Sequence, residues 1–320
     1  MQVYTLQAQG GFQEVASPDV AALLASPDTI FWVDMLGPSA EDLVVMREVF
    51  QFHPLAIEDT TNQRQRPKVE EYGDTLFTIV NTVELEDAEL SFRELDVFVG
   101  KHYLVTVHAE VEPVIEQVQR RCKNRAQYGQ VMTLGYVMYS LVDTVVDSYF
   151  PVLDTIGEEI ETMNEAILIR PEKQTLERLF RLKRTLAEMA RVAAQQRDMF
   201  SLLTRENSHL IREESLRYYL RDVYDHLLRI SDTVNSYRDM LSSVVELYMS
   251  AVSNRLNIVV QRLTVITIGI GVLTVISGFY GMNFERTWPP FSTEWGVPFV
   301  IVLMVLALII IALVAWWLER

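Results

Sequence analysis

Small and neutral oxygen-bearing side chains recur in the C-terminal part of the chain, at steps of three, four and seven residues. They are Asn257, Thr264, Thr267, Gly271, Thr274 and Gly278. Helical geometry places such positions on one face. Amide and hydroxyl oxygens there could hold a hydrated cation through its water. Small residues also let membrane helices pack closely. The face therefore predicts either a helix-packing surface or a pore wall made by several copies. The two interpretations overlap, because a pore-lining helix also packs against its copies.

The tripeptide Gly281-Met282-Asn283 follows this face, with Tyr280 before it and Phe284 after it. Gly and Asn often simply end a helix, because they tolerate left-handed backbone angles. Here, however, the tripeptide stands between two uncharged stretches, residues 263–280 and 297–318. About 20 helical residues cross the ~30 Å core of a bilayer. We predict a first span over about 260–280, an outer loop over 284–296 and a second span over 297–318.

Composition narrows the class of protein. The 320 residues carry a formal net charge of −15 and include one cysteine, Cys122. An acidic chain does not suit nucleic acid, which needs a basic face, but it does attract cations. One cysteine excludes an internal disulfide and a cysteine-rich metal site. The sequence has no HExxH pattern, phosphate-binding glycine loop or catalytic dyad, so we do not expect an enzyme.

Residues 1–130 are predicted to form a cytosolic α/β domain. Short apolar segments predict strands at residues 30–33, 75–80, 94–99 and 103–107. Helices are expected to start after Pro18-Asp19 and Pro38-Ser39. Alternating strands and helices are typical of a mixed α/β domain.

From about residue 131 the pattern becomes helical. We expect one helix over about 133–169 and another over 171–206, which pair antiparallel across Pro171-Glu172-Lys173 within a segment spanning 131–212. A third pattern starts near residue 213 and meets no proline before Tyr280. Residues 213–280 are thus predicted to form one stalk helix, ~100 Å long. Such a helix needs lateral support, most simply from its own copies.

The N-terminus, MQVYTLQAQGGF, lacks the basic and apolar regions of a signal peptide. We therefore expect the large N-terminal part and both termini in the cytoplasm, and the hairpin in the cell (inner) membrane. Trp316 and Trp317 suit an inner interfacial belt, and Trp288 and Trp295 an outer one.

Motifs along most of the chain resemble those of the CorA family of magnesium and cobalt channels. Besides Tyr280-Gly281-Met282-Asn283-Phe284, they are Ile57-Glu58-Asp59, Gln65-Arg66-Pro67-Lys68-Val69-Glu70, Tyr139-Ser140-Leu141-Val142-Asp143, Arg170-Pro171-Glu172-Lys173, Arg221-Asp222-Val223-Tyr224-Asp225-His226 and Ser253-Asn254-Arg255-Leu256-Asn257. The resemblance implies a homopentameric funnel in a lipid membrane. The first span would line the pore, and the second would lie outside it.

The resemblance also implies roles for single residues. Gly281, Met282 and Asn283 would form the selectivity filter, with five Asn283 amides as a ring of neutral acceptors. Such a ring can hold Mg²⁺ without stripping its tightly bound water. The implied pore-lining residues are Asn257, Val260, Leu263, Thr267, Gly271, Thr274 and Gly278. Among these, Val260 and Leu263 would form a constriction that closes by dewetting.

By the same resemblance, Asp222 binds regulatory Mg²⁺ between neighbouring cytosolic domains. A carboxylate of the N-terminal domain would complete that site, and the candidates are Glu84, Glu86 and Asp87. A solvated helix face is the alternative interpretation of Asp222. Asp222 and His226 lie one turn apart and could share a transition metal, although an exposed pair without a metal is the simpler interpretation.

We therefore predict a divalent-cation channel for Mg²⁺ influx, gated by cytosolic Mg²⁺, with Co²⁺ and Ni²⁺ as further candidate substrates. One alternative is a zinc transporter of the related branch, although Met282 favours magnesium because that branch's filter typically departs from Met. Another is a membrane-anchored metal sensor that does not conduct. Gly271 and Val272 stand where the family often has Met then Pro. That departure leaves the middle of the pore undefined.

Overall fold

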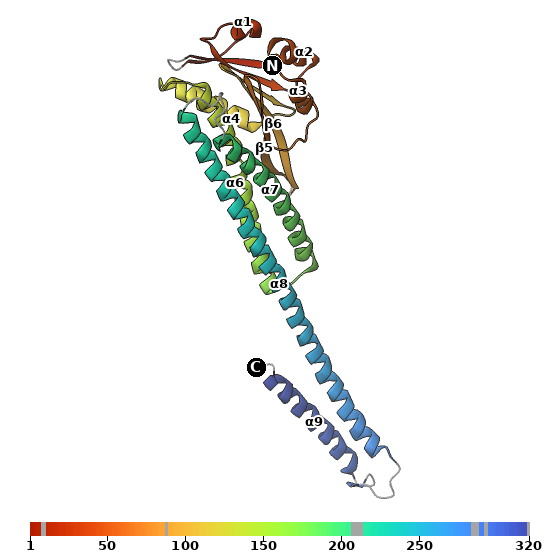
Figure 1. The fold of residues 1–320 in the computed structure, drawn as a ribbon. Helices are drawn as coiled ribbons and strands as arrows, with labels where there is room; N and C mark the ends of the chain where they lie inside the picture. The colour runs from red at the N-terminus through yellow and green to blue at the C-terminus, as the bar shows by residue number, and fades with distance from the viewer. Residues whose placement is uncertain (8–10, 87–88, 206–213, 283–287, 291–293, 319–320) are drawn as a thin grey trace. The chain divides into compact units, whose positions relative to one another are not determined.

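The computed structural model describes residues 1–320 except 8–10, 87–88, 206–213, 283–287, 291–293 and 319–320. Of residues 7, 86, 205, 214, 215 and 318 it describes the backbone alone. The chain divides into two compact units (Figure 1). The first comprises Met1–Ala166 and Glu172–Val245, and the second comprises Ile167–Pro171 and Glu246–Arg320. Each unit is considered by itself below.

The first unit contains a seven-stranded sheet with the order β2-β1-β3-β7-β6-β5-β4. Its strands are β1 (Gln2–Gln7), β2 (Gly11–Glu14), β3 (Ile30–Leu36), β4 (Lys68–Tyr72), β5 (Thr75–Glu86), β6 (Glu89–Val99) and β7 (Tyr103–His108). Neighbours run antiparallel except β3 and β7, which are parallel. All four predicted strands are present, at β3, β5, β6 and β7. The parallel pair confirms a mixed α/β fold, since parallel strands need a crossover connection.

One face of the sheet is apolar and is covered by short helices. These are α1 (Val20–Leu24), α2 (Ala40–Val44), the π-helical turn η1 (Val45–Val49) and α3 (Pro54–Thr61). Residues at alternate positions of the strands, such as Phe31 and Val33 of β3, are buried with Met46 and Ile57 in one apolar cluster. Asp19 caps α1, and Ser39 caps α2 in a capping box. Both predicted helix starts are therefore present.

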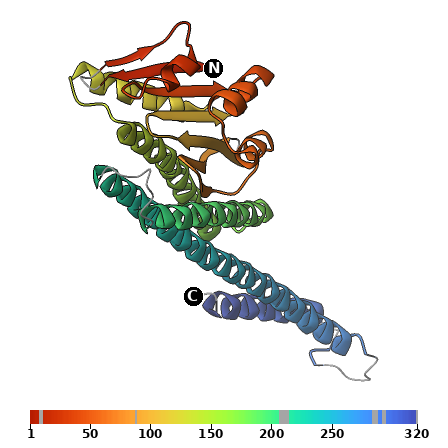
Figure 2. The ribbon, with the colours of Figure 1, turned by 45° about the horizontal axis from the view of Figure 1, so that its top comes forward.

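Three longer helices pack on the strands from the other side: α4 (Pro113–Gln127), α5 (Leu134–Asp147) and α7 (Lys173–Arg205) (Figure 2). A buried polar network ties α7 to strand β5. Gln196, which is fully buried, accepts from the backbone N–H of Asn81 at 2.8 Å and donates to the Tyr149 hydroxyl at 2.9 Å. Tyr149 in turn donates to the Asn81 carbonyl at 3.1 Å. These three hydrogen bonds fix the helix on the strand.

The helix expected over 133–169 is two helices, and that expectation is corrected. Helix α5 ends at Asp147, and α6 (Tyr149–Ile169) begins after Ser148. The reason is Pro151 in the first turn of α6: it offers no N–H and its ring would clash with the carbonyl of Asp147 in a continuous helix. Helix α8 then approaches α6 closely at Gly157, where an added Cβ would lie 2.6 Å from the Tyr237 hydroxyl.

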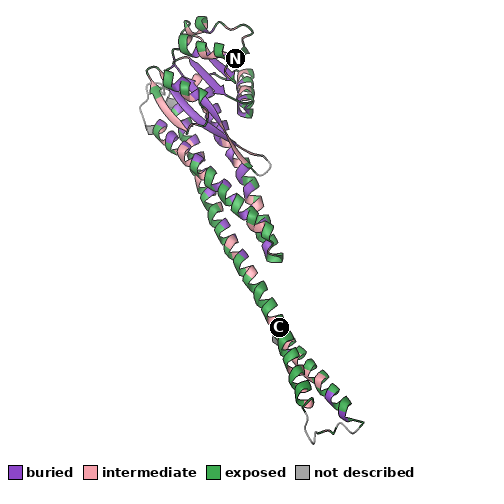
Figure 3. Ribbon diagram, turned by 90° about the vertical axis from the view of Figure 1, so that its right-hand side faces the viewer, coloured by how far each residue is buried: buried purple, intermediate pink, exposed green. Residues whose placement is uncertain are grey.

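Helix α8 (Glu214–Tyr280) has 67 residues and ends in the second unit, where α9 (Gly296–Leu318) follows. At 1.5 Å per residue it is ~100 Å long. Both helices contain apolar windows long enough to cross a membrane, and only 6% of each window is buried. The core helix of a soluble protein would be mostly buried, so these helices are not of that kind. Figure 3 shows the contrast between the buried sheet and the exposed C-terminal helices. The long helix and the two apolar C-terminal helices are as predicted.

Candidate ion pathway and cation sites

Helix α9 covers one side of the apolar part of α8. Gly269 is buried, and a Cβ added to it would lie 3.6 Å from Cδ2 of Leu308 on α9. Successive residues of an α-helix are rotated by about 100°. Positions two, five and nine residues from Gly269 therefore lie on the opposite side of α8. Five of the polar and small residues identified from the sequence occupy these positions, as does Val260 of the predicted constriction: Thr264, Thr267, Gly271, Thr274 and Gly278.

This opposite side is open in the single chain. Of the predicted pore-lining residues, Val260 and Leu263 expose 58% and 62% of their surface. The others are exposed as well, namely Asn257, Thr267, Gly271, Thr274 and Gly278. Nothing lies within 4 Å of a Cβ added at Gly271 or Gly278. A face of this kind is available to copies of the same helix, to water or to ions.

The threonine hydroxyls on this side have fixed proton positions. Thr264, Thr267 and Thr274 each donate to the carbonyl four residues earlier, at 2.8 Å in all three cases. A hydroxyl that has donated its only proton keeps lone pairs for accepting. These side chains can therefore accept hydrogen bonds from the water around a cation, in the way that a neutral filter requires.

Helix α8 ends at Tyr280, and the backbone is closely packed at the next residue, Gly281. Its N–H donates to the Ser277 carbonyl at 2.8 Å, and an added Cβ would lie 3.0 Å from that same oxygen. Met282 exposes 58% of its surface. The Tyr280 hydroxyl donates to the Trp288 carbonyl at 3.3 Å, which links the end of α8 to the residues before α9. Asn283, the predicted filter amide, lies outside the described residues.

Two of the predicted regulatory residues, Asp222 and Glu84, make separate contacts in the described part of the chain. Asp222 is exposed on α8, and its Oδ2 accepts from the Tyr139 hydroxyl of α5 at 3.3 Å. Glu84 lies on β5 and pairs with Arg93 of β6 at 2.5 Å. No hydrogen bond or ion pair joins Asp222 to Glu84 in the described part of the chain. The Glu86 side chain and Asp87 fall outside it.

A candidate cation site not predicted from the sequence lies one helical turn from Asp222. Asp143 and Asp147 of α5 meet His226 of α8, and one ligand atom from each lies within 4.8 Å of the others. Nδ1 of His226 is 3.8 Å from Asp143 Oδ1 and 3.7 Å from Asp147 Oδ1. Arg121 of α4 closes the cluster, 2.7 Å from Asp143 and 3.5 Å from Asp147. Burial and the charge of Asp143 raise the pKa of Asp147.

The sequence contains two pairs of residues that indicate parts of this cluster. Asp143 and Asp147 are four residues apart, as are Asp222 and His226. Each pair therefore lies on one helix face. What the sequence does not provide is the packing of α5 against α8 that brings the two pairs together. Two carboxylates and an imidazole suit a divalent cation, and Arg121 supplies the compensating charge without one.

Comparisons with known proteins identify the family and the fold. The sequence matches the family described as CorA-like Mg²⁺ transporter protein over residues 27–320. It is 35% identical to the cobalt/magnesium transport protein CorA of Thermotoga maritima, over 97% of this chain and 88% of that one.

The fold matches two solved structures at 20% identity. The complete CorA magnesium transporter of Methanocaldococcus jannaschii superimposes with a TM-score of 0.79, covering 98% of this chain and 97% of that one. The full-length CmaX protein superimposes with a TM-score of 0.77, covering 100% and 96%. These matches concern the fold alone. The family match and the Thermotoga relative show that the chain belongs to the CorA-like Mg²⁺ transporter family.

Proposed function

We propose that this protein is a homopentameric channel that carries Mg²⁺ into the cytosol, with α8 lining the pore. The observation that carries the proposal is the open side of α8 opposite Gly269. It bears small and neutral polar residues, while α9 covers the other side. One two-helix hairpin cannot enclose a pore, so several copies are needed. Five copies would place a ring of each pore-facing residue around the axis.

The chemistry of the proposed pore suits a hydrated divalent ion. Mg²⁺ loses its water reluctantly, so a conducting site should contact the ion through water. The open side of α8 offers threonine hydroxyls as acceptors and has no carboxylate within the span. Buried acids would be costly in a membrane and would hold the ion too tightly to release it. Co²⁺, cited in the name of the Thermotoga relative, could pass by the same route because its hydrated ion is similar.

We propose that cytosolic Mg²⁺ regulates the channel at Asp222 and the neighbouring Asp143–Asp147–His226 cluster. Both groups consist of residues of α5 and α8, and Tyr139 of α5 donates to Asp222 of α8. A cation there would neutralise clustered carboxylates and hold α8 against α5. Glu84, Glu86 and Asp87 remain the proposed carboxylates from a neighbouring chain. The proposed location is the cell (inner) membrane, with both termini in the cytoplasm.

The experiment that tests the proposal is Mg²⁺ uptake into proteoliposomes, followed with an internal fluorescent indicator. Asn283→Ala should abolish uptake and leave assembly intact, because the amide would face the pore and not a packed core. Asn164→Ala is the matched control, since Asn164 is exposed on α6 outside the proposed pore. Near-parental uptake by the Asn283 variant would refute the filter assignment. An intact assembly in which even the parent conducts no ion would favour a sensor.

A further inference from the structure

A pocket of about 680 Å³ lies in the first unit, and the proposed ion pathway does not use it. It is bounded by the loop of residues 62–67, by strands β5 and β6, by the end of β7 and by helix α7. Its volume falls in the range of pockets that enclose small organic ligands. No residue of α8 or α9 lines it. The residues that line this pocket therefore need an explanation separate from ion transport.

Four arginines line this pocket, together with the exposed carboxylate of Glu110. Arg64, Arg66 and Arg191 line it, all three are exposed, and none forms an ion pair with a residue that the structure describes. Arg93 also lines the pocket but is held by Glu84 at 2.5 Å and by the Val111 carbonyl at 3.5 Å. Three uncommitted guanidiniums at one opening are typical of phosphate recognition, because each offers a planar fork of donors.

The loop that carries Arg64 and Arg66 is fixed in advance. Oε2 of Glu94 accepts from the backbone N–H groups of Arg64 at 2.7 Å and of Gln65 at 2.6 Å. Arg64 has a positive φ of 84°, a conformation that such a clamp helps to hold. A fixed loop lowers the entropy lost when a ligand binds.

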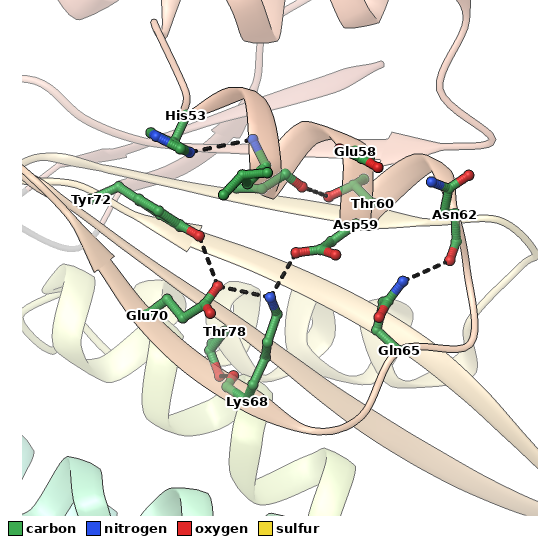
Figure 4. A network of polar contacts seen from close by, with 12 residues as sticks. His53, Glu58, Asp59, Thr60, Asn62, Gln65, Lys68, Glu70, Tyr72 and Thr78 are labelled. Carbon is green, nitrogen blue, oxygen red and sulfur yellow. Dashed lines mark hydrogen bonds and ion pairs between the residues drawn. The ribbon is translucent and has the colours of Figure 1, made fainter.

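The loop is held by further contacts, as Figure 4 shows. After the loop, Lys68 pairs with Asp59 of α3 at 2.6 Å and with Glu70 at 2.7 Å. Within the loop, the Asn62 carbonyl accepts from the Gln65 side-chain amide at 3.1 Å. Two of the sequence motifs, at residues 57–59 and 65–70, thus serve to hold this loop.

The inner part of the pocket presents hydrogen-bond acceptors. Oδ1 of Asn81 and Oε1 of Gln195 are buried, line the pocket and have no partner among the described residues. Asn81 is only 7% exposed, so bulk water does not serve it. Buried acceptors of this kind require a donor. Glu94 and Glu112 also lie here, but each has an oxygen that already accepts a hydrogen bond: Glu94 from the loop N–H groups, and Glu112 from the Thr82 hydroxyl at 3.0 Å.

The arginines and the buried acceptors together restrict the chemical class of ligand that the pocket can bind. A simple inorganic anion would satisfy the arginines and leave the buried acceptors unpaired. A lone cation would do the reverse. We propose that the pocket binds a nucleotide, with its phosphates on Arg64, Arg66 and Arg191 and its amino and hydroxyl donors on Asn81 and Gln195. Phe92 and Val192, which also line the pocket, offer apolar surface to the base.

The test is calorimetric titration of the full-length protein in detergent with ATP in the presence of EDTA, which removes metal binding from the signal. We expect saturable binding of one ATP per chain. Arg66→Gln and Arg191→Gln should each weaken it on the order of tenfold, the loss of a charge-assisted hydrogen bond. Arg191→Lys should weaken it less, since the charge remains. Arg197→Gln is the matched control, because Arg197 lies on the same helix, pairs with Asp198 and does not line the pocket.

Tripolyphosphate separates a nucleotide site from a general polyanion site. Gln195→Ala should weaken ATP binding and leave tripolyphosphate binding unchanged, because Gln195 would contact only the donor end of the ligand. Absence of saturable ATP binding by the parent would overturn the proposal. So would equal affinity for ATP and tripolyphosphate, or an equal loss with Arg197→Gln. Thermal melting of each variant shows that it is folded. None of these readouts depends on ion conduction, so they stand apart from the transport proposal.

Discussion

Asp96 on strand β6 is fully buried, and neither of its carboxyl oxygens has a hydrogen-bond donor among the described residues. Burial raises the pKa of Asp96 well above its ordinary value, and the charge of neighbouring Glu94 raises it further. A raised pKa means that the folded protein favours the protonated form of this carboxyl group. It then needs an acceptor instead of a donor, and Glu94 provides one. The missing donors are thereby explained.

We predict that Asp96→Asn stabilises the protein above neutral pH. An acid whose pKa is raised in the folded state loses stability as pH rises from its unfolded pKa, about 3.9, through its folded pKa. Asn is neutral at every pH and avoids that loss. Its melting temperature at pH 8 should exceed the parent's by a few degrees, about 1 kcal/mol. The gain should vanish near pH 4. Asp28→Asn, an exposed control, should change little. A lower melting temperature for Asp96→Asn at pH 8 would contradict the assignment.

Asp222 is a second single residue whose substitution tests the proposal, because we propose that it takes part in gating. An ion that binds the closed state better shifts the population towards that state. Asp222→Ala should therefore leave the channel active at internal Mg²⁺ concentrations that close the parent, and should reduce the protection that Mg²⁺ gives against protease. Asp225→Ala is the control, since Asp225 is exposed one turn away. Unchanged Mg²⁺ inhibition and unchanged protection with Asp222→Ala would remove this residue from the sensor.

At the scale of elements, the sequence identifies long or strongly patterned segments well. Strands β3, β5, β6 and β7 carry apolar runs, and α8 has no proline or break for 67 residues. The short strands β1, β2 and β4 carry no such pattern, and they form because neighbouring strands supply their hydrogen bonds. The sequence pattern does not locate the helix break at Ser148, because the cause of the break, Pro151, lies three residues later.

The candidate site residues also differ in how well the sequence predicts them. The polar side of α8 follows from spacing along one helix, so the sequence is sufficient to find it. The Asp143–Asp147–His226 cluster and the Gln196–Tyr149 network depend on which helices pack together. Contacts between distant segments leave no local pattern, and a single sequence therefore does not reveal them.

The two sides of α8 should respond differently to a thiol reagent. We predict that Gly271→Cys, on a background without Cys122, makes Mg²⁺ uptake sensitive to a small cationic thiosulfonate. Gly271 lies opposite α9 with open space around it. Gly269→Cys is the matched control: its side chain would meet Leu308 and be shielded. Both variants first need near-parental uptake without reagent. Inhibition at position 269 but not 271 would reverse the orientation assigned to the helix.

At the scale of the whole molecule, the exposed apolar surface of the second unit must be covered. Only 6% of the apolar windows of α8 and α9 is buried within one chain. Lipid suits the aliphatic surface of α9. It does not suit the threonine oxygens and glycine backbone on the open side of α8, because polar groups facing hydrocarbon are costly. Copies of α8 arranged around a water-filled axis would satisfy both surfaces.

We therefore predict that the purified protein is a pentamer in detergent and in lipid nanodiscs. Its mass, measured by native mass spectrometry, should correspond to five chains. Charge-bearing substitution on the open side of α8, such as Thr274→Arg, should shift the mass towards smaller species, because five like charges would meet near the axis. Ser236→Arg is the control, since Ser236 is exposed on α8 in the first unit, outside the apolar window. A parent protein that remains a monomer or dimer at working concentrations would contradict the pore, since neither form can surround an ion.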